Sequence, residues 1–578
     1  MGSIRKVLIY IFIPVLFLGS LYSAAKKYSV NREIRFIYPW KHSLFPREFA
    51  PPTFYWSDKS KIAHVWDIRI NLAGHHPFIT KTVYQNRWKP DLSMWDSIKT
   101  FSNYKDIKIV ISRKKSSKIS FLGQKAELPI RISEDEVGAP ILYREIPLPF
   151  IYAEKHIWET SYALYNVGSS NPRHEALGQF MVCGNCHSST RDGKTIALDF
   201  DAVSRDKGGY FIANIDSQVV FNNDNYMSWS KIEGKSTFGL FSKISHEDRY
   251  VLTTIKDRVI NVKFDAPSAI AYSELFFPIN GVIAIYDRAT KKLAELPGAN
   301  DTAYIQSNGI WTPDDKYIIF ARAKALPYPD KSSRYESLIS DTTITNAFVR
   351  RKRDLKFDLY IIPFNDGKGG EAKPIEGASF NGQSNYFPAI SPDNKWLVFC
   401  ESNNYMMIQP DSKLFIVPRE GGKAIKLACN FPEMNSWHAW SPNGKWMVFV
   451  SKGLSIYTDM FLTHIDNKGH ASIPVLLEDS KRPRCAANYP EFINRDPSFT
   501  FDMKYEYINT LLIQAAIHEG KIEQARKMVK QYLEQGQTST PVEYEDLGNI
   551  MLKLGDKKEA DKYFKLEAQG DSSFYSRF

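Results

Sequence analysis

The sequence predicts a mainly β protein, in which repeated strand–turn–strand units are preceded by a small β-sandwich and followed by an α-helical repeat unit. Three observations carry this prediction. One turn pattern recurs four times between residues 196 and 495, short alternating apolar runs precede it, and two similar helical segments follow it. At 578 residues the chain is too long for one core, so about three to four domains are expected.

The composition is that of an ordinary globular protein and argues against a nucleic-acid partner. Hydrophobic residues make up 43% of the chain and charged residues 24%. The net charge of +11 comes from 75 basic and 64 acidic residues that are interspersed along the sequence. The one dense basic run, Arg350–Arg353, is typical of a solvated loop, whereas nucleic-acid binding needs a basic stripe on a matching fold.

Residues 1–27 are predicted to be a signal peptide or a membrane anchor. Arg5 and Lys6 precede an apolar run from Val7 to Ala25. As a helix this run would span about 28 Å, close to the thickness of a hydrocarbon core. The small residues that end it also suit cleavage, so both alternatives stay open. Either one predicts export, to the periplasm or to the outer face of the cytoplasmic membrane, with membrane contact through this segment.

Residues 28–132 are predicted to form a β-sandwich-like domain. Apolar and polar residues alternate from Ile62 to Ile70, the period of a half-buried strand. Ile107–Ile111 and Lys118–Phe121 show the same alternation. The tryptophans at positions 56, 88 and 95 are available for a core between two sheets.

A cofactor motif lies in the segment 133–195, as Cys183-Gly184-Asn185-Cys186-His187. Two cysteines separated by two residues, with a histidine directly after them, form the attachment pattern of a c-type haem. The two thiols bond to the two vinyl groups of the porphyrin, and the histidine ligates the iron. The motif therefore predicts one covalent haem c, with Cys183 and Cys186 as attachment sites and His187 as proximal ligand. Bacteria attach this haem outside the cytoplasmic membrane, which agrees with export.

Three other chemistries of the motif were weighed. A zinc site needs a second ligand pair, but Cys400, Cys429 and Cys485 are isolated in the sequence. A dithiol redox site of the thioredoxin type needs a βαβ context, which the surrounding β-like sequence does not offer. A structural disulfide is the remaining alternative.

The surroundings of the motif differ from those of a small cytochrome. A short helix from Arg173 to Met181 is expected before Cys183. The segment is shorter than a complete cytochrome c domain, so residues from elsewhere would have to complete the pocket. Met227 is the first candidate for the distal iron ligand, and His174 and His438 are alternatives.

The repeats of residues 196–495 share a strand, a tight turn and a second strand. Proline presets the first turn corner in the later three copies, Asp or Asn tolerates the next, and an aromatic and aliphatic run follows as a buried strand. The four copies begin at Ser245, Thr312, Ser391 and Ser441, which are 67, 79 and 50 residues apart.

These copies resemble the WD40-like repeats of TolB-type β-propellers, in which Ser-Pro-Asp-Gly-Lys marks each blade. The resemblance implies a β-propeller over 196–495, with six blades favoured and seven or eight still open. A blade takes about 40–45 residues, so the longer gaps must hold insertions. One such insertion is expected at Arg322–Lys356.

The region 500–570 is predicted to be helical and repeated. Gly520 and Gly555 are 35 residues apart, as are Ala525 and Ala560. This period is close to the 34 residues of tetratricopeptide repeats, which the segment resembles. Two copies are fewer than the roughly three that are stable alone, so docking on the propeller or on a partner is expected.

Together these features predict an exported, envelope-associated c-type cytochrome with a propeller scaffold, an electron carrier or binding scaffold rather than a turnover enzyme. The alternatives are a TolB-like envelope scaffold without an essential redox role, and a haem-dependent oxidoreductase. The expected partners are envelope redox or structural proteins. No hydrolytic or nucleotide-binding motif is present in the sequence.

Overall fold

A computed structural model of the chain describes most of its residues. The described residues are 34–59, 65–72, 79–102, 106–114, 125–178, 183–201, 208–234, 236–264, 272–326, 338–339, 342–350, 352–506, 510–534 and 541–575. The chain divides into two compact units. The first comprises residues 1–43 and 51–132, and the second comprises 44–50 and 133–578.

Within its described residues, the first unit contains two antiparallel sheets and one helix, α2 (Leu92–Ser102). The strand order in the first sheet is β1 (Ile34–Tyr38), β3 (Phe54–Asp58) and β6 (Arg87–Trp88). The order in the second sheet is β8 (Lys125–Ile132), β7 (Ile107–Arg113), β4 (Trp66–Leu72) and β5 (Ile79–Val83). Trp56 of one sheet packs edge-on against Trp66 of the other at 5.8 Å, and Trp95 of α2 is fully buried. The predicted strand at Ile107–Ile111 is confirmed, whereas Lys118–Phe121 lies outside the described residues.

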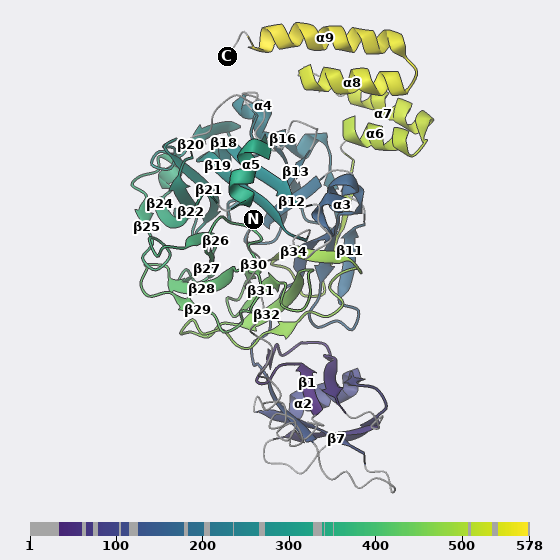
Figure 1. Cartoon of the computed structure of the whole chain (residues 1–578), viewed down its shortest axis with the longest axis vertical. Coiled ribbons are helices and arrows are strands. Elements are labelled where there is room, and N and C mark those ends of the chain that lie inside the picture. Colours follow the sequence, from purple (N-terminus) through teal and green to yellow (C-terminus); the bar gives the residue numbers. More distant parts are fainter. Residues whose placement is uncertain are drawn as a thin grey trace, which may run out of the picture. The chain divides into compact units, whose positions relative to one another are not determined.

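The second unit contains six antiparallel sheets within its described residues, arranged around a common axis (Figure 1). The first three are β34 (Cys485–Phe492), β9 (Ile141–Pro147), β10 (Ser161–Tyr165) and β11 (Arg173–Leu177); β12 (Cys183–Ser189), β13 (Thr195–Asp201), β14 (Gly209–Asn214) and β16 (Tyr226–Ser228); and β17 (Lys243–Ile244), β18 (Tyr250–Lys263), β19 (Glu274–Asp287) and β20 (Lys292–Glu295). The other three are β21 (Tyr304–Trp311), β22 (Tyr317–Lys324), β24 (Asp358–Pro363) and β25 (Lys373–Pro374); β26 (Ser384–Ile390), β27 (Trp396–Ser402), β28 (Lys413–Pro418) and β29 (Ile425–Lys426); and β30 (Asn435–Trp440), β31 (Trp446–Ser451), β32 (Asp459–His464) and β33 (Val475–Leu476).

This arrangement is a β-propeller with six blades of four main strands each. In each sheet named above, the first strand is the innermost one. The innermost strands contact one another in succession around the axis, in the order β12, β17, β21, β26, β30 and β34, and β34 contacts β12 again. One blade joins distant parts of the chain, because its inner strand β34 pairs with β9. The predicted propeller and its favoured six blades are thus present.

A repeated polar turn follows the inner strands other than β34. In the copy at Ser391, the hydroxyl donates to Asp393 Oδ1 at 2.6 Å and accepts from the Trp396 amide at 2.9 Å. Residue Asn394 has a φ of 62°, the left-handed conformation that Asn, Asp and Gly adopt most readily. The same turn recurs at Thr312 and Ser441.

The boundaries differ from the predicted ones in the region 133–195. The structure places its strands β9, β10 and β11 in one blade and β12 in the next, so blade strands begin at Ile141. The predicted helix at Arg173–Met181 is wrong where the chain is described, because Arg173–Leu177 forms strand β11, the outer strand of its blade. The expected insertion between β22 and β24 contains β23 (Leu338–Ile339) and helix α5 (Thr342–Val349).

The remaining short elements lie outside the main strands of the blades. They are β2 (Leu44–Phe45), α3 (Phe150–Lys155), β15 (Gln218–Phe221), α4 (Trp229–Glu233), β35 (Asp502–Tyr505) and three single-turn 3-10 helices at Ile157–Glu159, Asn223–Asn225 and Asn365–Gly367. Strand β15 pairs in parallel with β35, which leads the chain from the propeller to its C-terminal helices.

Two helix pairs follow the propeller. They are α6 (Thr510–His518) with α7 (Ile522–Glu534) and α8 (Pro541–Lys553) with α9 (Lys557–Tyr575). Gly520 and Gly555 have φ angles of 74° and 83° at equivalent helix ends, and Ala525 and Ala560 are both fully buried. The helices therefore repeat with the predicted period. No helix within the described ranges is long and apolar enough to cross a membrane.

Candidate functional site: the propeller channel and the cysteine motif

Six residues, five from inner strands and one just before β17, form a collar in the middle of the propeller. The collar residues are Cys186, Phe241, Asn308, Phe387, Trp437 and Tyr489. The first five lie four residues before the serine or threonine of a turn, and Tyr489 occupies the corresponding place in β34. All except Cys186 have φ angles between 41° and 57°, which turn the backbone at an interruption of the strand.

Ring contacts and hydrogen bonds join the collar residues. Phe387 contacts Phe241 at 5.7 Å and Trp437 at 6.5 Å between ring centroids. The side chain of Asn308 accepts a hydrogen bond of 2.7 Å from the amide of Phe387. The Tyr489 hydroxyl interacts with the Cys186 thiol. Sequence equivalence and these contacts together define the collar as one level of the channel.

Two cavities lie on either side of the collar. The turn-face cavity, of about 740 Å³, is lined by the ends of the inner strands and by the turns. The opposite-face cavity, of about 350 Å³, is lined by the starts of inner strands together with residues of α3, β18, β19 and β23. Trp437 and Tyr489 line both cavities, so the collar separates them.

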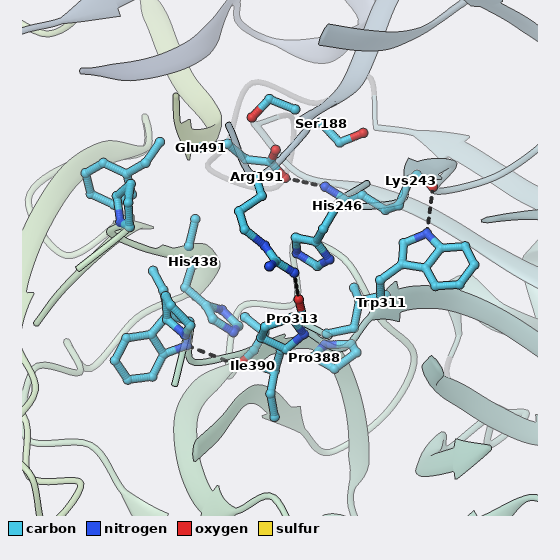
Figure 2. A pocket seen from close by; sticks show the side chains of 18 of the residues that line it. Ser188, Arg191, Lys243, His246, Trp311, Pro313, Pro388, Ile390, His438 and Glu491 are labelled. Atoms are coloured by element: carbon cyan, nitrogen blue, oxygen red, sulfur yellow. Dashed lines mark hydrogen bonds and ion pairs between the residues drawn. The ribbon is translucent and has the colours of Figure 1, made fainter. Parts of the chain in front are cut away.

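All six blades contribute to the turn-face cavity (Figure 2). Its lining combines aromatic and proline surfaces with charged groups, and Figure 2 shows Arg191, His246 and His438 among the side chains around it. Trp311 donates its indole N–H to the Lys243 carbonyl at 3.1 Å, which fixes the ring against the wall. His246 contacts Asp315 at 2.7 Å, so its orientation is also fixed.

The predicted haem motif forms the inner strand β12. Its residues pair with β13, and Cys183 lies opposite Asp201 and His187 opposite Leu198, with a bulge between Gly184 and His187. The strand exists because the turn that follows it is a fifth copy of the blade turn, Thr190-Arg191-Asp192-Gly193-Lys194. Thr190 donates to Asp192 at 2.8 Å and accepts from the Thr195 amide at 3.1 Å, as in the other copies.

His187 lies in the core between two blades. Its side chain is 1% exposed, and its ring packs edge-on against Tyr162 at 6.0 Å and Tyr489 at 5.5 Å. Nε2 lies 3.3 Å from the carbonyl oxygen of Leu142, and Nδ1 has no hydrogen-bond partner in the described part of the chain. Burial lowers the pKa of this imidazole to about 3, with a smaller effect of Lys243, so it is neutral at physiological pH.

Cys186 faces the channel on the other side. It lines the opposite-face cavity beside Asp199 and Tyr489. Burial raises the pKa of its thiol to about 12, and the nearby Asp199 adds to this shift. Burial also raises the pKa of Asp199 well above its usual range. The thiol is therefore protonated and a weak nucleophile at neutral pH.

These positions provide a test of whether the motif fits a haem. Cys186 lines the opposite-face cavity, but His187 lines neither cavity and contacts the core around Leu142 and Tyr162 instead. A haem bonded to Cys186 and ligated by His187 does not fit β12 in this arrangement.

The three candidate distal ligands of the haem iron lie on other strands than the cysteine motif. Met227 lies on β16, the outer strand of the same blade, which is three strands and roughly 14 Å from β12. His174 lies on the outer strand β11 and contacts Asp502 at 2.9 Å. His438 lies on β30 next to the collar and lines the turn-face cavity, with Nδ1 3.9 Å from the Cys400 sulfur.

No group of three or more His, Cys, Asp or Glu side chains is placed to hold a metal ion among the described residues. The other cysteines are dispersed as expected. Cys400, Cys429 and Cys485 are buried and free in separate strands or turns.

One feature of the site was missed at the level of sequence. Arg144 and Glu145 interrupt the apolar strand Ile141–Pro147; Glu145 joins neighbouring strands through Arg173 and Arg482, and Arg144 lines the opposite-face cavity. Charged residues within an otherwise buried strand are the available signal, because a buried charge needs a partner or a function.

The comparisons with known proteins add only broad likenesses. No protein-family model and no curated protein sequence matches the chain. A TolB structure from Agrobacterium tumefaciens is 10% identical, with a TM-score of 0.24 over 53% of this chain and 95% of that one. The periplasmic gluconolactonase PpgL of Pseudomonas aeruginosa is 9% identical, with a TM-score of 0.30 over 59% and 84%. Hydrazine synthase of Kuenenia stuttgartiensis is 12% identical, with a TM-score of 0.29 over 62% and 92%.

Proposed function

We propose that the protein is an exported binding protein of the cell envelope, of the TolB-like scaffold type, which binds a partner at the turn face of its propeller. One observation carries this proposal. All six blades converge on a cavity of about 740 Å³ that combines aromatic, proline and charged surfaces. Concave sites with an apolar lining and a few oriented polar groups are typical of binding sites.

Charge and rigidity support the same site. Lys243 forms an ion pair with Glu491 and donates to the His187 carbonyl at 3.2 Å, so the inner strands of three blades are joined beside the cavity. Arg191 donates to the Pro313 carbonyl across the cavity wall and lies 3.5 Å from Glu247. These contacts hold the polar groups before a partner binds, which lowers the entropic cost of association. Export is supported by Arg5, Lys6 and the apolar run that follows.

Photocrosslinking in intact cells tests this proposal. A photoreactive phenylalanine analogue at Arg191, which lines the cavity, is expected to crosslink to an envelope protein. The matched control is the same analogue at Phe380, which is 72% exposed and lines neither cavity. A defined adduct from position 191 but not from position 380 supports the site. Equal adducts at both positions, or none at 191, contradict it.

A covalent haem remains the second candidate, as a prediction of the sequence. One observation favours it, because Nδ1 of His187 is buried without a hydrogen-bond partner among the described residues. Cys183, Cys186 and His187 would hold the haem, which would supply one-electron redox chemistry when bound. The candidate requires β12 to rearrange, so that Cys186 and His187 face one space.

A pyridine haemochrome spectrum of the exported protein, co-expressed with the haem attachment machinery, tests this candidate. Covalent haem is expected to give an α-band in the wild type, and Cys186→Ala is expected to abolish the two-thioether form. Cys400→Ala is the matched control, because Cys400 is also buried but lies in a different blade. A wild type without an α-band would exclude the cytochrome and oxidoreductase alternatives together.

A further inference from the structure

The opposite-face cavity contains an arginine that lacks an acidic partner. Arg144 lies on β9 and lines this cavity. Among the described residues, its Nε is buried without a hydrogen-bond partner, and the guanidinium makes one long hydrogen bond of 3.4 Å to the Asn185 side chain. No carboxylate lies within ion-pair distance of Arg144 in the part of the chain that the structure describes.

Two neighbouring arginines have the carboxylate partner that Arg144 lacks among the described residues. Arg173 and Arg482 both form ion pairs with the buried Glu145, the residue next to Arg144, at 2.8 and 2.7 Å. Alternation along β9 places Arg144 on the other side of the strand from Glu145, towards the channel. A guanidinium at a partly buried position without a carboxylate is costly unless a ligand supplies one.

A carboxyl group with one unsatisfied oxygen lies in the same cavity. Asp199 is 9% exposed and lines the cavity, and its Oδ1 is buried without a hydrogen-bond partner in the described residues. Burial raises the pKa of this carboxyl well above its usual range, which favours its neutral form. A neutral carboxyl is a hydrogen-bond donor, and it complements the N–H donors of Arg144 around an oxyanion.

The other charged side chains at the cavity interact with groups of opposite charge. Lys263 forms an ion pair with Glu154 at 3.3 Å. Glu274 also lines the cavity, and burial raises its pKa, while Lys263, Arg144 and Lys452 act in the opposite direction. Burial lowers the pKa of Lys452 to about 8. Among the described residues, Arg144 thus lines this cavity without an ion pair to a carboxylate, whereas Lys263 has one.

Apolar side chains form much of the remaining wall. They are Phe150, Phe238, Phe241, Phe276, Leu338 and Met407. The volume of about 350 Å³ lies at the lower end of the range for small-molecule sites. Donors at one side and apolar surface elsewhere fit an anion with an apolar body rather than a free inorganic ion.

We propose that the opposite-face cavity binds a small carboxylate with an apolar tail, whose carboxylate is held by Arg144 and Asp199. This site is separate from the turn-face cavity, so it goes beyond the proposed function and does not rest on it. The guanidinium offers paired donors to the carboxylate, and the phenylalanine and methionine side chains cover the tail.

Calorimetric titration of the purified full-length chain tests the proposal, with octanoate and octanamide as probes. The two share one apolar chain and differ in charge. Octanoate is expected to bind at least about tenfold more tightly than octanamide, since hydrogen bonds to a charged group are stronger than neutral ones. Equal affinities for the two probes, or no octanoate binding up to millimolar concentration, would overturn the proposal.

Titrations of Arg144 variants with the same two probes form the second part of the test. Arg144→Gln is expected to reduce the affinity for octanoate to that for octanamide, while Arg144→Lys keeps part of the preference. Arg419→Gln is the control, because Arg419 pairs with Glu420 at the surface and lines neither cavity. Full octanoate affinity in a folded Arg144→Gln protein contradicts the proposal. If that variant does not fold, the comparison of probes in the wild type decides.

Octanoate binding by a preparation without a Soret band identifies a small free acid as the fitting ligand. Crosslinking from position 191 concerns the other cavity, so its failure is distinguishable from this result.

Discussion

Lowering the pH from 7 towards 3 is expected to destabilise the propeller strongly through His187 alone. The imidazole is buried and neutral, and its pKa in the folded protein is about 3, against 6.5 for the exposed group. Below pH 6.5 the unfolded chain binds a proton that the folded chain does not. The contribution of His187 is therefore complete above pH 6.5 and is lost as the pH falls towards 3, by roughly 4–5 kcal/mol in total.

Urea unfolding monitored by tryptophan fluorescence measures this effect at several pH values. His187→Gln is expected to be less stable than the wild type at pH 7 and to lose less stability on acidification, so that the two midpoints converge. His470→Gln is the matched control, because His470 is an exposed histidine in an ion pair with Asp466. Its pH dependence should follow the wild type. Parallel curves for His187→Gln and the wild type would show that His187 does not titrate as its burial requires.

The same measurement reports on the state of the motif. An imidazole that ligates iron cannot take up the proton at the ligating nitrogen, so a haem-bound His187 would titrate differently from the buried free side chain. His438 is a second buried histidine, whose pKa burial lowers to about 4. It is present in every variant above, and its contribution cancels in the comparison.

The fold was largely predictable because the blade turn is a local signal. A serine or threonine that bonds both to an acidic or amide side chain two residues on and to an amide five residues on leaves a recognisable pattern. The fifth copy at Thr190 lacks the proline, since Arg191 stands there, and it follows directly on the cysteine motif. It was therefore assigned to the haem segment and not to a blade.

The sixth inner strand could not be predicted from a turn at all. After β34 the chain leaves the propeller, so no second strand of the same blade follows it. Its partner β9 lies more than three hundred residues earlier, and such a pairing has no local signature. The collar depends on this strand for Tyr489, and it therefore emerges only in three dimensions.

The cysteine motif shows the limit of a spacing argument. The sequence identified Cys183, Cys186 and His187 as a unit because of their order. In β12, however, Cys186 lines the opposite-face cavity and His187 lies in the core. The chemical prediction assumed a helical segment before the motif, whereas the described residues there form strand β11.

Replacing Glu145 by glutamine is expected to open the blade that joins the two ends of the propeller. Glu145 is fully buried on β9 and accepts from Arg173 on β11 at 2.8 and 3.0 Å and from Arg482, just before β34, at 2.7 Å. Ser161 on β10 donates a fourth hydrogen bond at 3.1 Å. One carboxylate therefore ties β9, β10 and β11 to the segment that leads into β34.

The neutral Glu145→Gln side chain leaves two partly buried guanidinium groups without their anion. Removing one partner of a buried ion pair costs about 3–5 kcal/mol, and the partial exposure of both arginines reduces the expected loss to about 3 kcal/mol.

The matched control is Glu175→Gln, which removes another carboxylate from the same Arg173 but at a 43% exposed position. That change should cost less than about 1 kcal/mol, because surface ion pairs contribute little. Urea midpoints measure both losses, and protease cleavage between β33 and β34 should accelerate in Glu145→Gln alone. Equal midpoints for the two variants would mean that closure of this blade does not depend on the buried carboxylate, and that the pairing of β34 with β9 is held by its backbone and apolar contacts.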